Sequence, residues 1–203
     1  MDKPKLLVIA GCNGSGKSSF SKAFTENETK PYDYDKIYKE KYESLIDTEF
    51  RDRMAHNLAR KDLEDTIKTT INNRINFCYE TNFNSTPLYW PEIFRSNSYR
   101  IELVYFCLNS IETAKERVRI RFENGGHFVP DNEVESRYKL GFKHLNENWK
   151  FFDSVTLFET SQYNDTPNHL FTMEENQIIL KSDFSEYLDK LIPNIKDCVN
   201  KKH

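Results

Sequence analysis

Gly11-Cys12-Asn13-Gly14-Ser15-Gly16-Lys17-Ser18 is the stretch that decides the fold. It matches the pattern Gly-x-x-x-x-Gly-Lys-Ser/Thr of a phosphate-binding loop. Glycines let the backbone curl until successive N–H groups point at phosphate oxygens. We expect Lys17 to reach the β- and γ-phosphates of a nucleoside triphosphate and the Ser18 hydroxyl to ligate Mg²⁺.

The residues around this loop give it the context that a chance match would lack. Leu6–Ala10 is a short apolar run typical of a strand buried on both faces, and Ser18–Phe24 starts a helix whose positive end faces the loop. ATP with Mg²⁺ is therefore the cofactor pair that we expect. The predicted nucleotide-binding residues are Gly11, Asn13, Gly14, Ser15, Gly16, Lys17, Ser18 and Ser19.

Strands and helices alternate along the rest of the chain. This alternation predicts βαβ units and a largely parallel sheet, hence an α/β fold flanked by helices. The expected strands are 77–80, 101–108 and 154–158. The expected helices follow caps at Asp47 or Thr48, at Asn109 and at Asp131, and a short one starts at Pro87. The segment 30–38 reads as irregular. A β-hairpin (169–173 and 177–181) and a last helix complete the chain.

The 203 residues fit one domain, with a core over about 5–160 and the hairpin and helix over 165–203. The net charge of −3 provides no overall basic field, so nucleic acid is not an expected partner. No signal peptide and no run of about 20 apolar residues is visible, which indicates a cytoplasmic protein without membrane contact. The four cysteines are too widely spaced for a zinc site.

Carboxylates follow the loop in two places. Asp33 and Asp35 should point the same way if their segment is extended, where one could accept a hydroxyl proton and the other hold a water on Mg²⁺. A solvated acidic turn is the alternative. Glu80 and Thr81 end a predicted strand, where ligands of open α/β sheets bind, although a capping role is equally open.

Arginines gather on the helix that ends near Phe122. Arg117 and Arg121 are four residues apart and share a face, whereas Arg119 points elsewhere. Gly125-Gly126-His127 follows, which suits a hinged lid over ATP, with His127 bonded to substrate or phosphate or pinning the lid. A solvated basic face with a flexible loop is the alternative reading.

Together these residues resemble the zeta-toxin-like P-loop kinases over about 5–160. The shared motifs are Gly11–Ser18, Asp33-Tyr34-Asp35, Glu80-Thr81, Arg121-x-x-x-Gly-Gly-His-x-Val-Pro130 and Arg137-Tyr138. The resemblance implies a five-stranded, mostly parallel sheet with a helical lid. It also implies phosphoryl transfer from Mg-ATP to a sugar hydroxyl of UDP-N-acetylglucosamine, the reaction of the founding toxins.

The resemblance assigns roles to single residues. It implies that Asp35 is the catalytic base, that Lys17, Arg121 and Arg137 stabilise the γ-phosphoryl group, and that Glu80 and Thr81 contact substrate. Asp33 is the other candidate for the base and otherwise a substrate contact. The chain departs from the family pattern at Asn82-Phe83-Asn84 and at Glu159-Thr160-Ser161, so the acceptor, and any toxicity or protein inhibitor, stays open.

The expected function is thus an ATP-dependent small-molecule kinase. Two alternatives remain: a nucleotide-dependent binding module with slow hydrolysis, and a polynucleotide 5′-hydroxyl kinase, which would need a basic channel.

Overall fold

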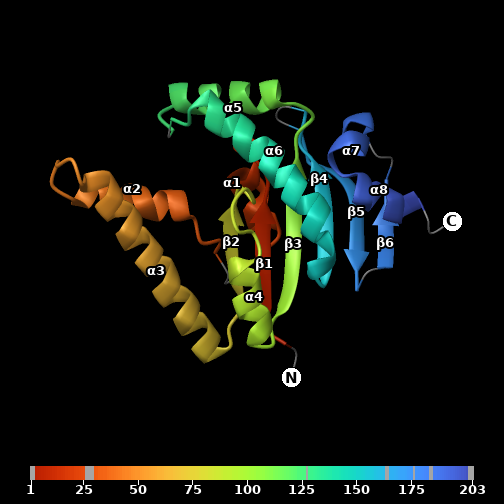
Figure 1. Cartoon of the computed structure of the whole chain (residues 1–203), viewed down its shortest axis with the longest axis horizontal. Coiled ribbons are helices and arrows are strands. Elements are labelled where there is room, and N and C mark those ends of the chain that lie inside the picture. Colours follow the sequence, from red (N-terminus) through yellow and green to blue (C-terminus); the bar gives the residue numbers. More distant parts are fainter. Residues whose placement is uncertain are drawn as a thin grey trace.

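The structure is a computed structural model that describes residues 3–25, 30–126, 128–162, 165–175, 177–182 and 185–200. Six strands form one twisted sheet in the order β2-β1-β3-β4-β5-β6 (Figure 1). The first four strands in that order are parallel, and the last two are antiparallel additions. The strands are β1 (Lys5–Ala10), β2 (Phe77–Thr81), β3 (Arg100–Cys107), β4 (Ser154–Glu159), β5 (Asn168–Glu174) and β6 (Gln177–Lys181).

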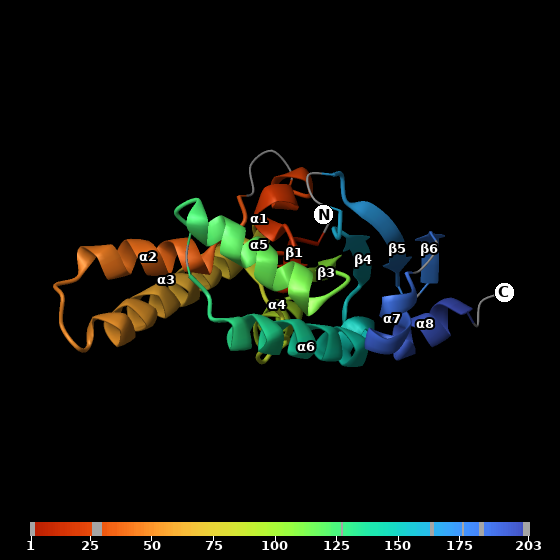
Figure 2. The ribbon, with the colours of Figure 1, turned by 90° about the horizontal axis from the view of Figure 1, so that it is seen from above.

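Helices cover the two faces of the sheet unequally. The face that carries Leu6 and Val8 packs into a large core shared with α6 and the C-terminal helices, whereas the face of Ile9 is covered by Phe20 of α1 and by Phe24. Figure 2 shows α1 and α6 on opposite sides of the sheet. The helices are α1 (Lys17–Phe20), α2 (Tyr34–Ser44), α3 (Arg51–Asn73), α4 (Tyr89–Ser96), α5 (Ile111–Glu123), α6 (Asp131–Asn148), α7 (Glu186–Leu191) and α8 (Pro193–Asn200).

The helix α6 shows why the sequence pattern produces this packing. Its buried residues recur at helical spacing, which directs one stripe of the helix onto the sheet. These residues are Val134, Tyr138, Gly141, Phe142 and Leu145. In Figure 1, α6 begins near the end of the sheet where the phosphate loop leaves β1 and runs obliquely over β3 and β4.

Helices α2 and α3 form a hairpin that projects from the β2 edge of the sheet (Figures 1 and 2). Tyr32, just before α2, pairs with Tyr79 in a parallel bridge, so the chain enters this hairpin along the sheet edge. The expectation of an irregular segment over 30–38 is wrong from Tyr34 onward. The Asp33 carboxylate caps the helix by accepting from the Lys36 N–H, which a helix start of this kind requires.

Two other details of the elements differ from the sequence prediction. Ser110, not Asn109, caps α5 by accepting from the Thr113 N–H at 3.1 Å. Asp131 is the first residue of α6 rather than its cap, a position that favours a carboxylate because the N-terminus of a helix is positive.

The α/β fold class is confirmed, but the C-terminal hairpin changes the sheet. Instead of standing apart, the hairpin continues the sheet: β5 pairs antiparallel with β4 and β6 pairs antiparallel with β5, which gives six strands rather than five. The physical reason is that β4 would otherwise be an open edge, and β5 supplies its missing hydrogen bonds. Within the described part of the chain, no helix has both the length and the apolar composition that a membrane span needs.

Candidate functional site

The phosphate loop closes between β1 and α1 as its glycines predict. Gly14 and Gly16 both have left-handed backbones, with φ of 79° and 84°. A Cβ on Gly14 would lie 2.9 Å from the Ala114 carbonyl oxygen, so the loop also needs glycine for its close approach to α5. The loop is thus shaped by its own backbone and by a helix a hundred residues later.

Lys17 lies with its ammonium group inside the loop. Its Nζ donates to the carbonyl oxygens of Gly11 at 2.7 Å and Cys12 at 3.0 Å, and to Asn82 Oδ1 at 3.1 Å. Burial lowers the pKa of Lys17, and the nearby negative charges of Glu80 and Asp35 act against that shift. The lysine is therefore electrostatically coupled to both carboxylates.

Ser18 and Glu80 meet at the edge of the loop. The Ser18 hydroxyl donates to Glu80 Oε2 at 2.7 Å, across a sequence separation of 62 residues. A hydroxyl and a carboxylate are hard oxygen donors of the kind that Mg²⁺ accepts, either directly or through water. These two residues fit a magnesium site beside the phosphates. Glu80 therefore lies on the ATP side of the cleft, whereas the sequence suggests a contact with the substrate that receives the phosphoryl group.

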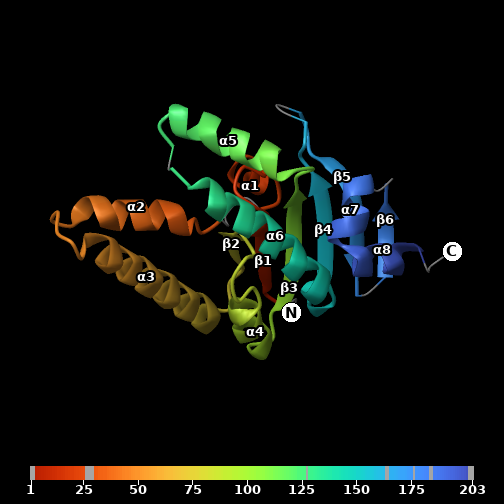
Figure 3. The same ribbon diagram turned by 45° about the horizontal axis from the view of Figure 1, so that its top comes forward.

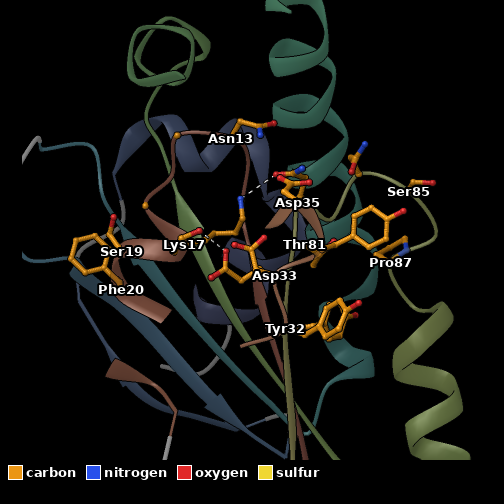
Figure 4. A pocket seen from close by; sticks show the side chains of 18 of the residues that line it. Asn13, Lys17, Ser19, Phe20, Tyr32, Asp33, Asp35, Thr81, Ser85 and Pro87 are labelled. Atoms are coloured by element: carbon orange, nitrogen blue, oxygen red, sulfur yellow. Dashed lines mark hydrogen bonds between the residues drawn. The ribbon is translucent and has the colours of Figure 1, made fainter. Parts of the chain in front are cut away.

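The two aspartates do different things. Asp33 is the cap of α2, whereas Asp35 lies in the first helical turn, so their expected arrangement on one extended segment is wrong. Both line the same cleft as Lys17, and Figure 4 shows the two carboxylates on one side of the lysine. Asp35 makes no capping bond and remains the more available of the two as a base.

The end of β2 lies next to the phosphate loop and lines the same cleft. Thr81 lines the cleft, but its Oγ1 accepts from the Phe83 N–H at 3.0 Å and so shapes the turn that follows. Asn82 is a site residue to which sequence reasoning assigned no role. The only signal in the sequence was its departure from the family pattern, because its contact with Lys17 exists only in the folded chain.

The arginines divide as the helical spacing predicts. Arg117 and Arg121 line the cleft, whereas Arg119 pairs with Glu116 and Glu123 on the outer face of α5. Arg117, which was not among the predicted site residues, donates to the Gly14 carbonyl at 3.3 Å and to the Ser161 carbonyl at 3.0 Å. It thereby ties α5 to the loop.

Arg137 reaches the loop from α6. Its Nη1 donates to Asn13 Oδ1 at 3.1 Å and its Nη2 to Glu133 Oε2 at 2.6 Å. In this structure it holds the tip of the phosphate loop rather than facing the cleft.

The connection between α5 and α6 lies beside α2 (Figure 3). The Gly126 N–H donates to the Arg121 carbonyl at 2.9 Å, and Gly126 and Phe128 border a hollow that Tyr38 and Tyr42 of α2 also line. His127, the predicted substrate or phosphate contact, is outside the described residues.

One cleft of about 1240 Å³ is lined by Lys17, Ser18, Asp33, Asp35, Glu80, Thr81, Asn82, Arg117 and Arg121. The phosphate loop forms one wall. The other wall is formed by the start of α2, by α3, and by β2 with the segment that follows it. That second wall carries aromatic and hydroxyl or amide side chains. They are Tyr32, Tyr34, Tyr79, Asn84, Ser85, Thr86, Tyr89 and Trp90, with Arg60 and Leu63 of α3.

Comparison with known proteins identifies one family and several solved structures that share the fold. The model of the Zeta toxin family matches residues 1–177. No curated protein matches the sequence. Among solved structures, a chain of the PezAT chromosomal toxin–antitoxin system of Streptococcus pneumoniae is 13% identical with a TM-score of 0.61, and the match covers 99% of this chain and 88% of that one.

Two further structures share the fold. A chain of the AvrRxo1-ORF1:AvrRxo1-ORF2 complex has a TM-score of 0.65 at 12% identity, with 94% of this chain and 63% of that chain covered. A chain of the Pnkp1/Rnl/Hen1 RNA repair complex has a TM-score of 0.54 at 24% identity, with 75% of this chain covered. This chain spans only 47% of that repair protein, so these likenesses support the fold alone.

Proposed function

The chain belongs to the zeta toxin family and is an ATP-binding P-loop kinase, and we propose that it transfers the γ-phosphoryl group of ATP to a hydroxyl of a small molecule. A nucleotide sugar such as UDP-N-acetylglucosamine is the first acceptor to test. The proposal covers the acceptor class, the magnesium ion and the roles of single residues.

The observation that carries the proposal is one cleft with a phosphate loop on one wall and a carboxylate facing it. Lys17 and Asp35 line the same cleft, and the charge of Asp35 acts on the Lys17 ammonium. Sites for one small ligand usually measure about 300–1000 Å³. At about 1240 Å³, this cleft has room for a nucleotide and an acceptor together.

The proposed chemistry uses the groups in their observed places. ATP binds with its β- and γ-phosphates on Gly11–Ser18, where the loop N–H groups and Lys17 hold them. Asp35 accepts the proton of the acceptor hydroxyl, and that oxygen forms a bond to the γ-phosphorus. The bond between the γ-phosphorus and the oxygen that bridges it to the β-phosphorus breaks, and ADP leaves with this bridging oxygen.

Ser18 and Glu80 would hold Mg²⁺, which would neutralise charge on the phosphate oxygens. Arg121, from its place on the cleft wall, would stabilise the charge on the transferred group, and Arg117 lies on the same face. Arg137 would act by keeping Asn13 and the loop in position. Asp33, Thr81 and His127 are the proposed contacts on the acceptor side, and Glu80, first expected there, is assigned to the magnesium site instead.

The test is incubation with Mg-ATP and a panel of nucleotide sugars, free sugars, nucleosides and an oligonucleotide with a 5′-hydroxyl. We expect one small-molecule acceptor to raise ADP release and to appear as a product heavier by one phosphoryl group. Lys17→Ala should lower that rate by about two orders of magnitude or more, because the lysine stabilises the charge of the transition state.

A different result would select one of the alternatives. ADP release that no acceptor raises, together with nucleotide-dependent binding of a protein partner, would identify a binding module. Phosphorylation of the oligonucleotide alone would identify a polynucleotide kinase. Because Lys17→Ala also removes ATP-dependent thermal stabilisation if the loop is the binding site, a variant that Mg-ATP still stabilises fully would place the nucleotide elsewhere.

A further inference from the structure

Asn82 lies where the two walls of the cleft meet. It follows β2 directly, and its Oδ1 accepts a hydrogen bond from the Lys17 ammonium at 3.1 Å. An ammonium group has donors only, so the amide must present its oxygen to the lysine. Asn82 is thus a neutral hydrogen-bond acceptor for Lys17, the cation of the phosphate loop.

The turn that carries Asn82 is fixed from both sides. Phe83 has a left-handed backbone with φ of 58° and is fully buried. Its N–H donates to Thr81 Oγ1 at 3.0 Å, and its carbonyl oxygen lies 3.0 Å from His144 Nδ1 on α6. Because Phe83 is bonded to both β2 and α6, the backbone of Asn82 is fixed in position and its side chain is directed to the cleft.

The hydrogen bonds of Lys17 leave no proton for a ligand. An ammonium group donates three hydrogen bonds. Two of them end on the loop carbonyls of Gly11 and Cys12, and the third ends on Asn82. A phosphate oxygen that binds Lys17 in this arrangement has to replace an acceptor, and Asn82 is the only one of the three outside the loop itself.

We propose that Asn82 is a positioning residue that couples nucleotide binding to acceptor binding, because its amide oxygen holds Lys17 until phosphate replaces it. Once the β- and γ-phosphates take the third proton of Lys17, the Asn82 oxygen is free to accept a hydrogen bond from a hydroxyl or N–H of the acceptor. The first half of this inference, that Asn82 restrains Lys17, is independent of the reaction. The second half, that Asn82 then binds the acceptor, rests on the proposed kinase function. It predicts an ordered reaction in which ATP binds first.

Nucleotide titrations test the first half without any acceptor. Asn82→Ala removes the competing oxygen, so a non-hydrolysable ATP analogue should bind about tenfold to a hundredfold more tightly, the range expected when a hydrogen bond to a charged group no longer has to be broken. Asn82→Asp should weaken binding about tenfold or more, because a carboxylate holds Lys17 more strongly and repels phosphate. AMP, which lacks the β- and γ-phosphates, should bind equally to all variants.

Asn84→Ala is the matched control for these titrations. Asn84 lines the same cleft two residues later, and the three hydrogen bonds of Lys17 end elsewhere. We expect this variant to bind every nucleotide like the unaltered protein. The proposal is overturned if Asn82→Ala weakens AMP and the ATP analogue equally and lowers the melting temperature, because Asn82 would then only support the turn.

The second half is tested with an acceptor that the unaltered protein phosphorylates. Asn82→Ala should raise the KM for that acceptor about tenfold while the KM for ATP falls or stays the same. An unchanged acceptor KM overturns the coupling. If the unaltered protein phosphorylates nothing, the proposed function fails, and the titrations still decide whether Asn82 restrains Lys17.

Discussion

At the scale of single residues, the two aspartates after the phosphate loop have different roles within one motif. Asp33 accepts the Lys36 N–H and starts α2, which is a structural task. Asp35 follows in the first turn, and its charge acts on Lys17. The Asp-x-Asp pattern alone could not separate these roles, because both side chains line the cleft and only the start of α2 decides which carboxylate caps the helix.

This division predicts different effects for conservative changes. Asp35→Asn should lower kcat by about 10²–10⁴-fold, the usual contribution of a general base, and leave ATP affinity unchanged. Asp33→Asn should keep most activity, since asparagine caps helices as well as aspartate does, whereas Asp33→Ala should cost about 1 kcal/mol of stability.

Steady-state kinetics and chemical denaturation measure both quantities for the three variants. If Asp33→Asn abolishes turnover and Asp35→Asn does not, the base is Asp33.

At the scale of elements, α6 connects the donor and acceptor walls of the cleft. Arg137 near its start holds Asn13 of the phosphate loop, and His144 in its last third holds the turn after β2. Between them, Gly141 lets the helix approach closely. A Cβ there would lie 2.7 Å from the Tyr105 hydroxyl and 3.1 Å from the Asn82 carbonyl oxygen.

Gly141→Ala should therefore destabilise the protein, although alanine is the better helix former. The added methyl has to displace Tyr105 or the Asn82 backbone, and such overpacking costs about 1–3 kcal/mol. Lys143→Ala, at an exposed position of the same helix, should change stability by less than about 0.5 kcal/mol. Denaturation of both variants gives the comparison, and a Gly141→Ala protein at least as stable as the parent would show that α6 does not pack as closely as described.

At the scale of the whole molecule, the C-terminal hairpin and helices share the core of the nucleotide-binding part. Phe171 of β5 and Leu188 of α7 are buried in the same apolar cluster as Leu6 of β1. The sheet runs without a break from β2 beside the cleft to β6 at the far edge (Figure 1). We therefore expect the chain to unfold as one unit, in which residues without a catalytic motif support the site by packing.

Leu188→Ala tests this expectation in the intact chain. Removing a fully buried leucine should cost about 2–5 kcal/mol and shift one cooperative transition that nucleotide still stabilises. Ile179 is 61% exposed on β6, and Ile179→Ala should shift that transition little. Two separate transitions in Leu188→Ala, only one of them responsive to ATP, would show that the C-terminal part is an independent unit.

The sequence alone determined the phosphate loop. A phosphate loop is eight consecutive residues whose glycines and lysine act through local backbone geometry, so the pattern is readable without a fold. The α/β class followed from the alternation of apolar runs. Only the tertiary structure decided which distant residues meet that loop, because Asn82, Arg117 and Arg137 reach it across separations of 65, 103 and 124 residues. Such contacts depend on how helices cross a sheet, which no local pattern encodes.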